Sequence, residues 1–256
     1  MLFAARSESR VFIPILATLV AGAWVSLAVW GASPAGYLLD HGELGHTRPA
    51  LSGSFIATMA GFMAGWTLMT SAMMLPTIIP LLDILRRTAG PALAGAVIAA
   101  AATGYVTVWA LFGAVAHAAD YLLHRGVDSH AWLHANTWLL GAAPLLLAGV
   151  YQFSPLKHLC LDKCRSPFSF VAARWRGDHP RLRALRIGLD HGVFCLGCCW
   201  ALMLLMFAVS AGNLAWMLVL AAVMGIEKNA SWGHRLTQPA GVVLLTTGLT
   251  LVVTNL

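Results

Sequence analysis

Long unbroken runs of apolar residues limit what this chain can fold into more than any other feature. A helix needs about 20 apolar residues to cross a bilayer core about 30 Å thick. The 256-residue chain has six or seven such runs, and it is 59% hydrophobic and only 10% charged, which is too apolar for a soluble domain. The sequence therefore predicts an all-α fold, one polytopic transmembrane helix bundle of six to seven spans over residues 1–256. The expected spans are residues 11–30, 55–82, 92–116, 136–153, 187–209, 214–226 and 240–253.

The basic residues indicate which side of the membrane each loop faces, because Lys and Arg gather in cytoplasmic loops. A cytoplasmic N-terminus leaves only Arg48 and Arg125 outside, so 14 of the 16 Lys and Arg residues lie inside. Eight of them fall in residues 153–187, which we predict to be a cytoplasmic basic loop. The basic loops of the predicted topology thus account for the sequence pI near 9.4. We expect no nucleic-acid partner, because the sequence lacks the pattern of basic and aromatic residues typical of nucleic-acid binding.

All the cysteines of the chain fall within about 40 residues, a clustering that favours metal binding. Side chains three and four residues apart share one face of a helix, so each of the two cysteine segments would present its sulfurs together. Two such faces opposite each other form a thiolate cage, and thiolates select soft transition metal ions such as copper(I) and zinc. A cytoplasmic position keeps the thiols reduced. The predicted ligands are Cys160, Cys164, Cys195, Cys198 and Cys199.

Histidines and methionines near the cysteines extend the predicted metal site. His158 and His191 are candidates to ligate the ion or to orient a ligand. Met73 and Met74 precede Pro76 at an expected helix kink, and their thioethers suit copper(I), which we expect rather than zinc. The alternative for the methionines is ordinary packing, and the alternative for the cysteines is burial as small apolar residues.

Residues that flank the cysteine motif have structural interpretations. Gly188, Gly192 and Gly197 predict that a neighbouring helix closely approaches the cysteine face. Glu227 and Lys228 end an expected span, where we predict an interfacial ion pair or contact with lipid headgroups.

Histidines on the predicted outer side form a second candidate metal site. Spacings of seven and four residues would pair them on helical faces, where imidazoles bind copper or zinc. These histidines are His117, His124, His130 and His134, and the carboxylates that would complete the site are Asp40, Glu43, Asp120 and Asp128. Scattered loop histidines without a ligand are the alternative.

The cysteine pattern favours a protein that transports a soft metal or delivers it, with a metallochaperone or metalloenzyme as partner. One alternative is a membrane thiol-disulfide oxidoreductase in which Cys195 and Cys198 cycle between dithiol and disulfide. Another is a structural or assembly subunit with packed cysteines. An enzyme is not favoured, because the sequence shows no nucleophile-base-acid constellation, phosphate-binding loop or nucleotide fingerprint.

Several short motifs resemble a family of bacterial integral membrane proteins that is described as predicted metal-binding and is otherwise of unknown function. They are Ala72-Met73-Met74-Leu75-Pro76, Ser154-Pro155-Leu156-Lys157, Cys195-x-Gly197-Cys198-Cys199-Trp200 and Glu227-Lys228. The resemblance covers roughly residues 55–230. It implies a multi-pass protein of the bacterial inner (plasma) membrane, with the lipid bilayer and a metal ion as partners.

Overall fold

The computed structural model describes residues 2–33, 54–209 and 213–256, and all regular secondary structure within them is helical. This confirms the all-α prediction. In chain order the elements are α1 (Leu2–Gly31), α3 (Ser54–Met74), the 3-10 turn η2 (Leu75–Ile78), α4 (Ile79–Ala89), α5 (Ala94–Ser129), α6 (Ala131–Ala135), α7 (Leu139–Tyr151), α8 (Pro155–Arg165), α9 (Pro167–Arg174), α10 (Pro180–Val209), α11 (Leu214–Asn229), the 3-10 turn η3 (Gly233–Leu236) and α12 (Thr237–Asn255).

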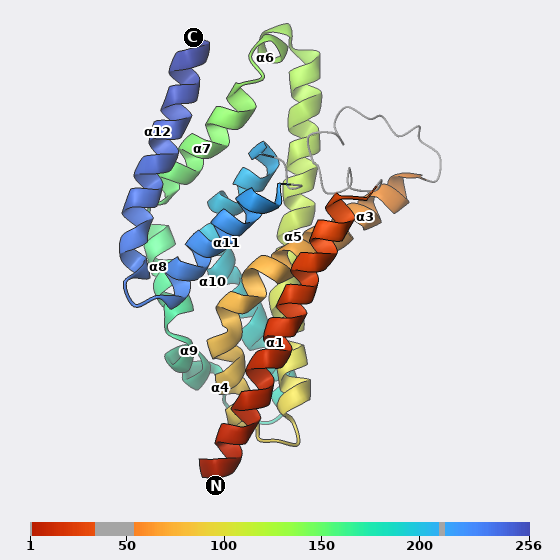
Figure 1. Ribbon diagram of the computed structural model, residues 1–256, viewed down its shortest axis with the longest axis vertical. Helices are drawn as coiled ribbons and strands as arrows, with labels where there is room; N and C mark the ends of the chain where they lie inside the picture. The colour runs from red at the N-terminus through yellow and green to blue at the C-terminus, as the bar shows by residue number, and fades with distance from the viewer. Residues whose placement is uncertain (1, 34–53, 210–212) are drawn as a thin grey trace.

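The helices form an elongated bundle in which α10 is the central element (Figure 1). It packs along α5 on one side and against α7, α8 and α11 on the others. α12 lies beside α7, and α1 lies beside α3 at the other flank (Figure 1). The cysteine segment of α10 is therefore enclosed by other helices.

Prolines break the apolar segments at two places that matter for the site. The second expected span is interrupted by η2, which has a proline in its first turn, and α4 also begins with one, at Pro80. This agrees with the kink predicted there. The second break lies between α7 and α8, which meet at an angle of 67°. Ser154 has an extended backbone because it precedes Pro155, and its hydroxyl accepts from the Leu156 N–H to cap α8.

Five helical segments in the described part of the chain are long and apolar enough to cross a membrane, and the bent α7–α8 pair would make a sixth. The fourth expected span is shorter than predicted, because α7 has only 13 residues before the bend. The expected span at 214–226 corresponds to α11, which with 16 residues falls below the length of a full crossing. The segment predicted as a basic loop is largely helical, since α8 and α9 each begin at a Ser-Pro pair.

Small residues set the spacing between α5 and α10. A Cβ added at Gly104 would lie 2.3 Å from the Leu185 carbonyl oxygen, and one at Gly188 would lie 2.0 Å from the Ala101 carbonyl oxygen. A Cβ at Gly192 would lie 3.0 Å from Val108. The predicted close helix approach is therefore present along this seam.

We expect Gly104→Ala to destabilise the protein by about 1–3 kcal/mol, because the added methyl group must push two backbones apart. Gly126→Ala, in the same helix, is the control, since a Cβ there meets no atom within 4 Å. SDS titration of the purified protein in detergent micelles would measure both. Equal stability of the two variants would contradict the assigned packing.

Candidate metal centre

Three thiols from α10 form the core of the candidate site. The Sγ atoms of Cys195, Cys198 and Cys199 all lie within 4.8 Å of one another. Their spacing of three and four residues puts them on one face of the helix, as predicted. Each residue is at most 1% exposed, so the sulfurs face the interior of the bundle.

The second cysteine segment contributes one sulfur to this cluster. The Cys164 Sγ on α8 lies 3.9 Å from the Cys198 Sγ, so the two segments meet. Cys160 is placed differently, because α8 turns its side chain toward the backbone of α10 at Gly197. A Cβ added at Gly197 would lie 2.6 Å from the Cys160 Sγ. Both cysteines of α8 are therefore buried, but the contact shown with the thiol cluster is that of Cys164.

A buried ammonium group sits among these sulfurs. The Nζ of Lys228, in the last turn of α11, is 2.8 Å from the Cys195 Sγ and 3.5 Å from the Cys199 Sγ. It is also 3.6 Å from the Met74 Sδ. Lys228 is 6% exposed, so these sulfur atoms take the place of most of the water around its ammonium group.

The hydrogen bonds distinguish Cys195 from the other two thiols of α10. An ammonium group can only donate, so the Cys195 sulfur accepts from Lys228, and the Tyr105 hydroxyl lies 2.8 Å from the same sulfur. The thiols of Cys198 and Cys199 instead donate to the Cys195 backbone oxygen, at 3.1 and 2.9 Å. This pattern favours a thiolate at Cys195 beside two protonated thiols.

The two predicted methionines lie at the border of the site. Met73 and Met74 end α3, directly before η2, and both are almost completely buried. Only Met74 has a polar contact, which is the one with Lys228. The break at η2 brings the end of α3 against α11, as expected from the kink at Pro76.

A second buried ion pair fixes α8 to α11. The Lys157 Nζ donates to Glu227 Oε2 at 2.8 Å, and both side chains are at most 2% exposed. Arg165 donates to the Glu227 backbone oxygen and, at 3.0 Å, to that of Ser231. The interfacial position predicted for Glu227 and Lys228 was therefore wrong. Both side chains are buried in the bundle, where Glu227 pairs with Lys157 and Lys228 contacts the sulfurs.

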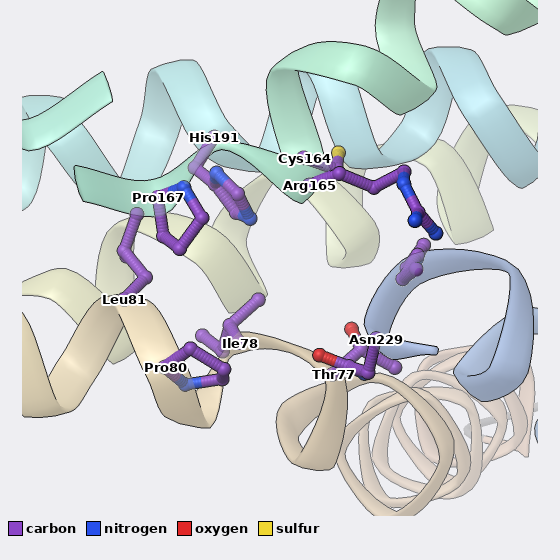
Figure 2. Close-up of a pocket in the computed structure, with 10 residues that line it drawn as sticks. Thr77, Ile78, Pro80, Leu81, Cys164, Arg165, Pro167, His191 and Asn229 are labelled. Atoms are coloured by element: carbon purple, nitrogen blue, oxygen red, sulfur yellow. The ribbon is translucent and has the colours of Figure 1, made fainter. Parts of the chain in front are cut away.

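A pocket of about 140 Å³ adjoins the cluster. Cys164 and Lys228 line it, together with residues of η2 and α4, the last residue of α8 and the first residue of α9 (Figure 2). The ring of His191, on α10, is directed into this space (Figure 2). His191 is 2% exposed, and its Nδ1 has no hydrogen-bond partner.

The remaining predicted histidines lie elsewhere. The Nδ1 of His158 is 3.2 Å from the Nε2 of His234 on η3, so the partner that the structure gives it is another histidine. Among the histidines predicted to face outward, the His117 ring stacks on Phe62, and His124 lies 3.4 Å from the Asp120 carboxylate. In the described residues these outer histidines do not converge with acids into a group of three. Asp40 and Glu43 lie outside the described residues.

Sequence reasoning missed three residues that touch the sulfurs or support them: Tyr105, Lys157 and Lys228. The available signal was the pair Glu227-Lys228 at the end of an apolar helix, because ionisable residues in such segments usually have partners inside the protein. Tyr105 carried no comparable signal, because aromatic residues are common in apolar helices.

A sequence profile of the copper chaperone family PpoB2 matches residues 63–251, which is most of the chain. The matched region contains every cysteine, Tyr105 and Lys228. No curated protein and no solved structure matches the chain.

We expect Glu227→Gln to destabilise the protein by about 3–5 kcal/mol, because it leaves the Lys157 ammonium buried without a counter-charge. Asp190→Asn is the control, since its ion pair with Arg174 has the same 2.8 Å separation but is far more exposed. It should cost at most about 1 kcal/mol. Unfolding in detergent would measure the loss of stability in each variant. Similar losses would show that burial does not determine how much the Lys157–Glu227 pair stabilises the protein.

Proposed function

This chain belongs to the PpoB2 copper chaperone family, and from that premise we propose that it is an integral membrane protein that carries copper(I) on clustered thiolates and delivers it to a partner. The observation that supports this most is the contact of Cys164 with Cys198, one member of the cluster that Cys195, Cys198 and Cys199 form. These four cysteines are the proposed ligands. Cys160 is left out of the set because its sulfur faces Gly197.

The donor atoms suit copper(I) by their chemistry. Thiolates and thioethers are soft ligands, and copper(I) is the soft ion among those that bind such groups. A buried thiolate needs a cation nearby, because an uncompensated charge in an apolar interior is costly. Two thiolates, one copper(I) ion and the Lys228 ammonium are together neutral, so the centre can hold its cargo without a further counter-ion.

Lys228 also suits a site that must release its cargo. With copper absent, the ammonium stabilises the Cys195 thiolate, while a second thiol regains its proton. Copper loading then releases that proton, and copper departure takes it up again. The net charge of the buried centre stays the same in both states, so neither state leaves an uncompensated charge in the apolar interior.

The pocket at His191 is the proposed access route for the ion. Cys164 and Lys228 line this pocket, whereas the cysteines of α10 do not. Copper would therefore meet Cys164 and Lys228 before it meets the sulfurs of α10. His191 has a free ring nitrogen at this point and can ligate the ion in transit. The role proposed for His191 is thus the auxiliary one expected from the sequence.

The placement in a membrane is supported by the apolar outer faces of the helices. Leu19, Val115 and Val253 are large apolar residues exposed on α1, α5 and α12. α1 begins and α12 ends at opposite ends of the long axis, which fits an odd number of passes (Figure 1). We propose a bacterial inner membrane location with a cytoplasmic N-terminus, and a metalloenzyme or metallochaperone as the recipient of copper.

The thiol-disulfide oxidoreductase alternative is weaker on the same geometry. Exchange requires a sulfur that a second thiol can attack, whereas Cys195 and Cys198 are at most 1% exposed. A bare metal ion is small enough to reach such sulfurs through the pocket.

We expect the double variant Cys198→Ser, Cys199→Ser to lose copper, because it removes two of the proposed ligands. Its affinity for copper(I) should fall by more than the roughly 10- to 100-fold that loss of an outer-shell partner costs. Competition with a copper(I) chelator under anaerobic conditions measures this. Cys160→Ser is the matched control and should keep wild-type affinity. Equal binding by the double variant and the wild type would refute the proposed ligand set.

Filling the pocket should slow copper loading without changing the final copper content. Asn229→Trp places a large ring at a residue that lines the pocket and is itself exposed. Asn255→Trp, at the exposed end of α12, is the control. Stopped-flow mixing with a copper(I) donor would give both rates. Unchanged loading in Asn229→Trp would show that copper reaches the thiols by another path.

A further inference from the structure

Two histidines that are far apart in the sequence face each other on the surface of the bundle. His158 lies on α8 and His234 lies on η3, and the Nδ1 of the first is 3.2 Å from the Nε2 of the second. The ring centroids are 4.7 Å apart. His234 is exposed and His158 is half-buried, so both nitrogens lie near solvent.

We propose that His158 and His234 form a second metal site, which takes a divalent transition ion such as zinc or copper(II) through two imidazole nitrogens. Two nitrogens bound at about 2.0–2.1 Å to one tetrahedral ion lie about 3.3 Å apart. The observed separation is close to this value, so an ion can be bound with little movement of the two rings. Imidazole nitrogen is a ligand that suits both zinc and copper(II).

The backbone that carries each ring is held in place. This favours metal binding, because little conformational entropy is lost when the ion binds. On α8, the Lys157–Glu227 ion pair and the Arg165 hydrogen bonds fix the helix against the α11–η3 corner. On η3, the Thr237 hydroxyl donates to the His234 backbone oxygen at 2.9 Å. A Cβ at Gly233 would lie 2.0 Å from the Ile226 carbonyl oxygen, so this corner is tightly closed.

An acidic residue is available to complete the coordination. Asp162 follows His158 by one turn of α8, which puts the two residues on the same helical face, and it is exposed. Glu227 is already neutralised by its ion pair with Lys157, so Asp162 is the carboxylate that can add negative charge beside a bound cation. Water can fill the remaining positions.

The site is separate from the thiol cluster but shares its supporting helix. His158 and Cys164 are six residues apart, which is about 9 Å along the axis of α8. An ion at the histidines would tie α8 to η3, and η3 follows the end of α11 that carries Lys228. Occupancy of the surface site would therefore stiffen the corner that positions Lys228 at the cysteines.

Zinc titration of the full-length protein tests this proposal. The protein in detergent is first given one equivalent of copper(I) anaerobically, to occupy the thiols, and is then titrated with zinc against a chromophoric chelator. We expect His234→Gln to bind zinc at least about tenfold more weakly than the wild type, since even an outer-shell partner of a metal ligand is worth that much. His158→Gln should behave in the same way.

His179→Asn is the matched control, because His179 is another exposed histidine and asparagine tolerates its positive φ of 69°. It should bind zinc like the wild type. Copper(I) affinity is measured on the same His234→Gln sample, and its retention shows that the fold and the cysteine site are intact. Wild-type zinc affinity in both histidine variants would overturn the proposal, whatever the result for copper(I), and would leave the pair as a hydrogen bond between two rings.

Discussion

The contact between the Lys228 ammonium and the sulfurs of α10 is the interaction on which the centre depends. A positive charge in this apolar interior is stable only beside an anion, and an anionic sulfur there is stable only beside a cation. Each therefore fixes the state of the other. The same contact brings the end of α11, the end of α3 at Met74 and the middle of α10 to one point.

The last turn of α11 organises the site because its two charged residues point in different directions. Glu227 holds α8 through Lys157, and Lys228 holds α10 through Cys195. Cys164 comes to the cluster on α8, so the Glu227–Lys157 contact positions its sulfur, while the Lys228 contact compensates the charge on Cys195. The close seam between α5 and α10 adds Tyr105, whose hydroxyl lies 2.8 Å from the Cys195 sulfur.

The sequence predicted the helical class, the break near Pro76 and the shared face of Cys195, Cys198 and Cys199, because each follows from local spacing. It did not reveal the helix α8 after the bend, because the polar and basic residues that follow Ser154 were predicted to form a loop. It also left the partners of Lys228 open, since these depend on how α11 is rotated against α10. Nothing in the sequence singled out His234, because its proposed role depends on its contact with His158, which lies 76 residues away in the chain.

The absence of a side chain at residue 197 would determine how many of the proposed sulfur ligands one ion can reach. Three sulfurs belong to α10 and are mutually fixed, whereas Cys164 arrives on a different helix, so its distance from Cys198 varies with the gap between α8 and α10. Any atom added at Gly197 would push against Cys160 and widen that gap. A glycine next to Cys198 would thereby influence the coordination number at the proposed site, and through it how tightly copper is held.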